Sequence, residues 1–130
     1  MSVASVLARG RVAAERLMTD TCTITRPGVR TWDAASGTYT QTSATVYTGK
    51  CRVRVLTPGD ETAQAGEEQV SLWRYVVSVP LTVDPRLDDE VALDTSADAT
   101  LVGRVLRVRQ VTRGSQITAR RMVCEEREAA

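Results

Sequence analysis

The spacing of apolar side chains changes once along the sequence, close to residue 20. Over residues 3–18, apolar side chains recur every three to four positions, which predicts an amphipathic helix. Ser2 stands directly before this stretch, where a helix N-cap is expected. Because the apolar stripe is narrow and contains Gly10, the predicted helix needs another surface to lie on, either its own sheet or a neighbouring molecule.

From residue 21 onward, apolar and polar residues alternate, and this period of two predicts strands. A first strand over TCTITR (residues 21–26) is closed by the Pro-Gly pair that follows it. Residues 33–37 then form the turn of a hairpin. The next strand, residues 44–56, is expected to bulge or bend at Gly49.

Residues 70–79 (VSLWRYVVSV) give the clearest strand pattern in the sequence. One face of this strand carries four large apolar side chains, which we expect in the core: Trp73, Tyr75, Val77 and Val79. Further strands are expected at residues 90–95, 100–113 and 115–127, the last two paired about a turn at residues 113–115.

This order of elements predicts a mainly β fold, with six to eight strands after one helix. We expect a small antiparallel β-barrel or sandwich with one N-terminal amphipathic helix and a long inter-strand loop. The 130 residues are interpreted as a single domain, 1–130, which is long enough to bury a core. Residues 21–126 form its barrel, and residues 127–130 form a frayed tail.

One inter-strand segment, LTPGDETAQAGEEQV (residues 56–70), is acidic and poor in apolar residues. Its central part, residues 57–69, is predicted to be a flexible acidic loop, much longer than the roughly two to five residues usual in a hairpin. Such a segment is either a hairpin tip without a role or a loop that becomes ordered against a partner.

The charges are divided along the chain, although the formal net charge is only +1. Residues 1–54 carry a net charge of +5, residues 55–103 carry −8, and residues 104–130 carry +4. Acidic and basic segments therefore meet either within one subunit or between neighbouring copies. The candidate subunit-interface residues are Arg107, Arg109, Arg120, Asp88, Asp89 and Glu90.

The sequence offers little for catalysis, so we expect that the protein is not an enzyme. It has no His, which excludes Ser–His–Asp and Cys–His arrangements, and it lacks nucleotide-binding glycine motifs. Cys22, Cys51 and Cys124 are widely spaced and are expected to be buried thiols, with no metal and no cofactor. No run approaches the roughly 20 apolar residues of a membrane span, so no membrane partner is expected.

A nucleic-acid-binding barrel is the alternative from a different functional class. Arg107 and Arg109 alternate with apolar residues, and Arg120 and Arg121 lie on the strand expected to pair with theirs, which gives a basic ribbon. No aromatic residue interleaves with these arginines, as stacking on single strands would require. A solvated or subunit-facing surface is therefore the favoured interpretation.

The order of elements nevertheless resembles one known group of proteins. The predicted helix leads into DTCTITRPG, a DAASGTYT hairpin and VYTGKCRVRV. Next come a long polar loop, then the segment VSVPLTVDPRLDDEVAL, and last the segment GRVLRVRQVTRGSQITARRMVCEE. Over nearly the whole chain this is similar to the small head-to-tail connector proteins of long-tailed phages, of the stopper or head-closure type, in the versions carried by phages and prophages of actinobacteria. These motifs are structural rather than catalytic.

The resemblance implies a virion protein of the phage neck, assembled in the host cytoplasm. Its copies would form a homo-oligomeric ring with portal and adaptor proteins above and the tail terminator or tail tube below. The ring would close the DNA-filled head and offer the tail its attachment platform, while DNA passes through without sequence-specific binding. The implied channel or inter-subunit loop holds Asp60, Glu61, Gly66, Glu67 and Glu68. A tail-completion or minor tail protein is the competing assignment among phage proteins.

Overall fold

A computed structural model describes residues 2–56, 62–65 and 68–127 of the chain. One helix, α1 (Val3–Arg16), comes first, and a short 3-10 helix, η1 (Ala99–Leu101), follows the fifth strand. The strands are β1 (Asp20–Asp33), β2 (Thr38–Val55), β3 (Thr62–Ala65), β4 (Glu68–Val79), β5 (Glu90–Thr95), β6 (Val105–Val111) and β7 (Arg120–Arg127). The predicted mainly β fold with one N-terminal helix is confirmed.

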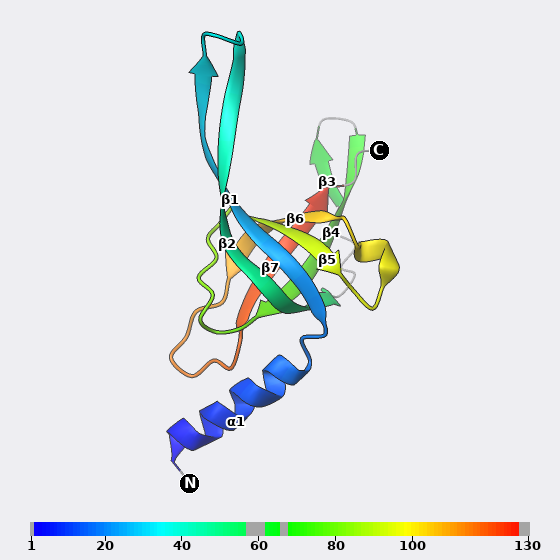
Figure 1. Cartoon of the computed structure of the whole chain (residues 1–130). Coiled ribbons are helices and arrows are strands. Elements are labelled where there is room, and N and C mark those ends of the chain that lie inside the picture. Colours follow the sequence, from blue (N-terminus) through cyan, green and yellow to red (C-terminus); the bar gives the residue numbers. More distant parts are fainter. Residues whose placement is uncertain (1, 57–61, 66–67, 128–130) are drawn as a thin grey trace.

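Six of the described strands form an antiparallel sheet that closes on itself, here called the ring (Figure 1). Their order is β2-β1-β5-β6-β7-β4, and β4 returns to pair with β2. This closing seam joins residues 52–55 of β2 to residues 75–78 of β4. A bulge or bend was predicted at Gly49. The bulge in β2 is not there, because Gly49 pairs regularly with Cys22. The register shifts instead next to Val46, between the pairs Ile24–Tyr47 and Thr25–Thr45.

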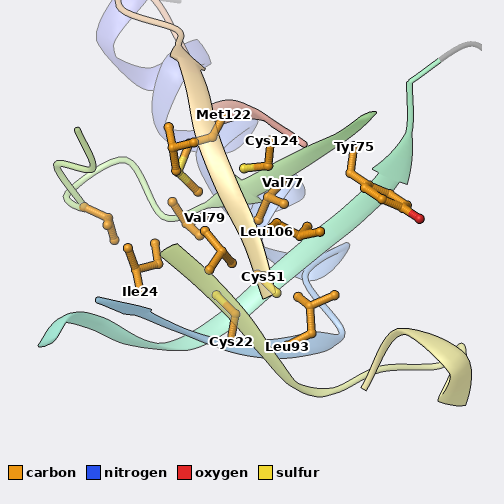
Figure 2. Close-up of a cluster of buried hydrophobic side chains, with 13 residues drawn as sticks. Cys22, Ile24, Cys51, Tyr75, Val77, Val79, Leu93, Leu106, Met122 and Cys124 are labelled. Carbon is orange, nitrogen blue, oxygen red and sulfur yellow. The ribbon is translucent and has the colours of Figure 1, made fainter. Parts of the chain in front are cut away.

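The inside of the ring holds the hydrophobic core (Figure 2). Aliphatic side chains from every strand of the ring meet there, so that each strand buries one face as the alternating pattern predicted. The largest fully buried apolar side chains are Ile24, Leu93, Leu106, Met122, Val77, Val79, Val91 and Val108. Burying one such side chain contributes about 1.5–3 kcal/mol, so these residues dominate the stability of the fold.

The predicted core face of β4 is right for Tyr75, Val77 and Val79 but wrong for Trp73, which is 44% exposed. The reason lies in the closing seam. Its last pair joins Val55 to Tyr75, so Trp73 extends beyond the part of β4 that the ring encloses. At that point β4 pairs with β7 on one side, Trp73 lying opposite Glu126.

β1 and β2 continue far beyond the ring as a two-stranded projection, here called the arm (residues 27–43; Figure 1). The pairing of β1 with β5 ends at Thr25, so beyond this residue β1 pairs only with β2. The sequence suggested that the Pro-Gly pair at residues 27–28 ends the first strand, but β1 continues beyond it. It falls at a register shift between Pro27 and Arg30, where the missing N–H of proline is tolerated.

The predicted turn at residues 33–37 is confirmed at the tip of the arm. The Gly37 N–H donates to the Asp33 carbonyl oxygen at 2.9 Å. Gly37 has a φ of +69°, a conformation that glycine adopts without steric penalty. The Asp33 carboxylate accepts bonds from the Ala35 N–H at 2.9 Å and the Ser36 hydroxyl at 3.0 Å, which lowers its pKa.

The helix lies at the opposite end of the molecule from the arm (Figure 1). Ser2 caps it as predicted, its hydroxyl accepting from the Ser5 N–H at 3.2 Å, but the helix ends at Arg16 and not at residue 18. No side chain of α1 is fully buried. The helix meets the ring through an ion pair of 3.1 Å between Glu15 and Lys50. At Gly10 a Cβ atom would lie 2.7 Å from Thr118, so glycine permits this approach.

The predicted flexible loop, residues 57–69, contains regular structure. β3 (Thr62–Ala65) pairs with the first residues of β4, from Glu68 to Ser71, in an antiparallel hairpin. Of the residues predicted for a channel loop, only Glu68 is described, and its backbone lies in β4 opposite Ala65. The other four, Asp60, Glu61, Gly66 and Glu67, lie outside the described residues, as do 128–130 of the predicted tail.

Among the helices in the described part of the chain, none combines the length and the apolar character needed to cross a membrane.

Candidate assembly surfaces

Two of the three arginines predicted for a subunit interface lie on the outer face of the ring. Arg107 and Arg109 occupy exposed positions of β6, alternating with the buried Leu106 and Val108. Arg109 is already engaged within the subunit, because its Nε donates to Glu125 Oε1 at 2.7 Å and its Nη1 to Asp88 Oδ1 at 3.3 Å. The bond to Glu125 is the main cause of the raised pKa of Arg109.

Arg120 connects two loops at one end of the ring. Its guanidinium donates to the carbonyl oxygens of Leu81, Val83 and Thr112 at 3.3, 3.3 and 3.0 Å. These bonds tie the segment after β4 to the segment after β6. Arg120 therefore has a clear structural role inside one subunit, which the sequence pattern did not indicate.

Asp89 forms the most buried ion pair among the described residues. Its Oδ1 accepts a hydrogen bond from Arg26 Nε and its Oδ2 accepts one from Arg26 Nη2, both at 3.0 Å. Its Oδ2 also accepts a bond from the Arg86 N–H at 2.8 Å. The hydrogen bond and the charge of Asp89 raise the pKa of Arg26. Asp89 is only 1% exposed, so the prediction of an interface role is corrected for this residue. Because Arg26 precedes the arm directly, this pair fixes the base of the arm to the loop before β5.

The acidic middle and the basic ends of the sequence thus meet within one subunit. Besides the pairs of Arg26 with Asp89 and of Arg109 with Asp88, Arg113 binds Asp84 at 3.1 Å. The pair with Arg113 lowers the pKa of Asp84. The charge division had left pairing within and between copies open, and these contacts show pairing within the subunit. Glu90 is half-buried in β5, whereas Arg107 is exposed.

The arm carries an ordered aromatic face without any core beneath it. Trp32 and Tyr39 are opposite each other in the ladder, with ring centroids 5.0 Å apart in an edge-to-face arrangement. The Arg30 guanidinium lies 4.8 Å from the centroid of the Tyr39 ring, a cation–π distance. Trp32 is 58% exposed and Tyr39 is 59% exposed. On the alternate face, the hydroxyl oxygens of Thr31 and Thr40 are 3.1 Å apart and hydrogen-bonded.

A hollow of about 210 Å³ lies at the end of β2 that is remote from the arm. Its lining is mainly apolar, with a carboxylate and a guanidinium, and consists of Val53, Val55, Trp73, Tyr75, Leu101, Thr100, Asp98 and Arg104. The volume is below the roughly 300–1,000 Å³ of small-molecule sites. We call this feature the hollow.

The three cysteines are buried and form no disulfide, and their predicted burial is confirmed. Burial raises the pKa of Cys124 to about 12. A hydrogen bond with Cys22 and burial together raise the pKa of Cys51, and Figure 2 shows these two side chains close together. The raised pKa values of Cys51 and Cys124 leave little thiolate, which makes these two thiols poor nucleophiles and poor metal ligands. Within the part of the chain that the structure describes, no group of three or more acidic or thiol side chains is placed to hold a metal ion.

Sequence reasoning missed the aromatic face of the arm. Trp32 stands directly before the predicted turn and Tyr39 two residues after it, which was a signal that they lie near each other across the hairpin. The signal that they are exposed was weaker. Between residues 28 and 44, threonines, serines and alanines surround the two rings, so that this part of the hairpin contains few residues able to form a core.

Comparison with known proteins supports the fold and identifies a family. The solution structure of protein SF1141 from Shigella flexneri 2a is similar, with a TM-score of 0.57 over 84% of this chain and 92% of that chain. The two sequences are 20% identical, so this likeness concerns the fold alone. Comparison with curated proteins gives no significant match. A family described as a family of unknown function (DUF6093) matches residues 10–125, and the chain therefore belongs to the DUF6093 family.

Proposed function

We propose that this protein is a structural component of the phage neck, where its copies form a ring between the portal and adaptor proteins and the tail. In this position the assembly of copies closes the DNA-filled head and provides the platform for tail attachment. DNA passes through without sequence-specific binding, and the acidic residues predicted for the channel loop, Asp60 and Glu61 among them, keep it from adhering.

The observation that carries the proposal is the arm. A hydrogen-bonded extension with Trp32 and Tyr39 more than half exposed adds nothing to the core of its own subunit. Exposed aromatic residues beside an arginine are typical of protein–protein interfaces. The resemblance of the whole sequence to head-closure proteins supports the same conclusion independently.

The alternative of nucleic-acid binding has less support. Arg109 is paired with Glu125 and Asp88, and Arg120 is used to hold loops, so two of the four arginines of the predicted basic ribbon are neutralised or occupied. Tight non-specific binding to nucleic acid requires several unpaired cations along a groove. A tail-completion protein remains the alternative among phage proteins, and the experiment below separates the two.

The test is to disrupt the gene in its phage and to examine the lysate by electron microscopy. A neck role predicts heads that package DNA but lose it, together with free, complete tails. Complementation with the wild-type chain restores tailed virions. Heads that retain their DNA but carry defective tails favour the tail-completion role, and normal virions contradict both roles. Light scattering of the purified protein with the portal–adaptor complex of the same genome then shows whether the complex recruits it.

A further inference from the structure

We propose that the arm of one copy binds the hollow of a second copy of this chain. Trp32 and Tyr39 lie against the apolar floor of the hollow, and Arg30 lies beside the Asp98 carboxylate. The inference deepens the proposed function, on which it rests, by naming the contact that joins neighbouring subunits.

The aromatic face of the arm is suited to binding because it is already ordered. The Thr31–Thr40 hydroxyl bond and the ladder pairs from Arg30–Gln41 to Asp33–Thr38 hold the two strands together. A bond of 2.8 Å from the Gln41 amide to the Gly28 carbonyl oxygen fixes the register shift near the base. Binding therefore requires little additional ordering of the backbone, which is one of the main free-energy penalties of association.

The hollow has the complementary chemistry. Val53, Val55 and Leu101 provide apolar surface for an aromatic ring. The cation of the lining, Arg104, is paired with Glu126, and Asp98 provides a negative charge at the edge. The Asp98 carboxylate accepts from the Thr100 hydroxyl at 2.6 Å and the Thr100 N–H at 3.0 Å, which lowers its pKa and keeps it ionised at neutral pH. An ionised Asp98 attracts the guanidinium of Arg30. The volume of the hollow suits the insertion of side chains better than a separate ligand.

The charge of the arm favours a protein over a nucleic acid as its partner. Between residues 28 and 43 the only charged residues are Arg30 and Asp33, so this segment is neutral overall. A nucleic-acid-binding ribbon would need an excess of positive charge to neutralise phosphates.

The positions of the two surfaces favour a second copy of the same chain. The arm and the hollow lie at opposite ends of β2, separated by on the order of 40 Å of extended strand between Thr40 and Val53. The arm therefore does not reach the hollow of its own subunit. A contact between two different surfaces of identical copies is heterologous, and such contacts form a closed assembly when the rotation from copy to copy closes on itself.

Two complementary variants test this contact. The receiver variant, Trp32→Ala with Tyr39→Ala, lacks the aromatic face but keeps the hollow. The donor variant, Val55→Arg, keeps the arm but places a bulky cation in the hollow. Both variants alter exposed side chains, so both are expected to fold, which thermal denaturation checks. The expected result is a 1:1 complex when they are mixed, whereas each variant alone stays monomeric by light scattering.

Nuclear magnetic resonance locates the contact. With ¹⁵N-labelled receiver and unlabelled donor, we expect chemical-shift changes at Val53, Thr100 and Leu101. No change up to ~1 mM donor, which corresponds to a binding free energy weaker than about −4 kcal/mol, overturns the inference. Chemical-shift changes confined to other surfaces also overturn it. The inference is likewise overturned if the chemical shifts of Trp32 and Tyr39 in the wild-type protein change with a single-stranded oligonucleotide but not with the receiver.

The matched control is a donor with Val29→Ser added. Val29 is an exposed apolar residue of the arm that belongs neither to the aromatic face nor to the ladder pairs from Arg30–Gln41 to Asp33–Thr38, so binding to the receiver should persist. No portal protein is present in these experiments, which separates the two proposals. Recruitment to the portal complex without donor–receiver binding contradicts this inference alone, and the reverse result contradicts the neck role alone.

Discussion

The two halves of β1 have the same backbone conformation but different environments. In the ring half, Cys22 and Ile24 are fully buried between β2 and β5. In the arm half, from Pro27 to Asp33, no side chain is buried, because β5 has ended and β2 is the remaining neighbour. The comparison teaches that the number of neighbouring strands, and not the strand pattern itself, decides whether a side chain enters the core.

The same comparison explains why the arm can exist without a core. Isolated two-stranded hairpins are marginally stable in water. Here the ring holds one end of the hairpin, and cross-strand pairs stabilise the rest, including Trp32–Tyr39 and the threonine pair. The ring thus supplies the stability of the fold, while the arm presents side chains that its own subunit does not need.

The largest expected effect on stability comes from truncating a side chain in the core of the closed sheet. Leu106 is fully buried in the core, so Leu106→Ala should lower the free energy of unfolding by about 3 kcal/mol through lost burial and the cavity that remains. Chemical denaturation measures this change. The control, Val105→Ala, alters the adjacent residue of β6, which is 51% exposed, and should lower it by less than ~1 kcal/mol. Equal effects would contradict the assignment of the two faces of β6.

An intermediate effect is expected at the base of the arm. Asp89→Asn removes the buried charge that binds Arg26, and should lower the free energy of unfolding by about 2 kcal/mol. This is less than for a fully buried pair because a third of the Arg26 side chain is exposed. Asp88→Asn is the matched control, since its pair with Arg109 is exposed and should contribute less than ~1 kcal/mol. Similar losses for the two variants would sink the idea that Asp89 anchors the arm.

The smallest effect on stability is expected in the arm. Trp32→Ala should change the global free energy of unfolding by less than ~1 kcal/mol, because Trp32 packs on Tyr39 and not on the core. Amide hydrogen exchange should show faster exchange at Thr31 and Thr40, with unchanged protection at Val91 and Val108. A large loss of global stability would mean that the arm belongs to the cooperative unit of the ring.

The sequence was sufficient to predict that each strand of the ring exists, because each of them buries one face. Two predicted strands, residues 100–113 and 115–127, began too early, since β6 starts at Val105 and β7 at Arg120. The alternation of Val77 and Val79 with polar neighbours, and the pairing of β6 with β7, were read directly from that pattern. The prediction for Trp73 failed although its parity was right. Alternation says which face a residue occupies, but not where the neighbouring strand ends.

The candidate surfaces were harder to predict than the core. The charge division suggested contacts between acidic and basic segments, but whether Asp89 meets its own Arg26 or that of a neighbour depends on tertiary structure. The projection of the arm depends on β5 being shorter than β1, a relation between strands about 70 residues apart in sequence that no local pattern contains. The hollow combines β2, β4 and the segment around η1 for the same reason.

The pairing of β1 with β5 also affects how the chain folds. The hydroxyls of Thr21 and Thr95 are 2.6 Å apart although 74 residues separate them in sequence. Contacts between such distant residues form late, because a long loop must close first, whereas a hairpin around residues 33–37 forms locally within microseconds. The hairpin of the arm is therefore expected to form first and only transiently, and to become stable once the ring has closed. Until β5 arrives, the edge of β1 stays open to other strands, and crowded folding intermediates would be at risk of pairing with the wrong chain.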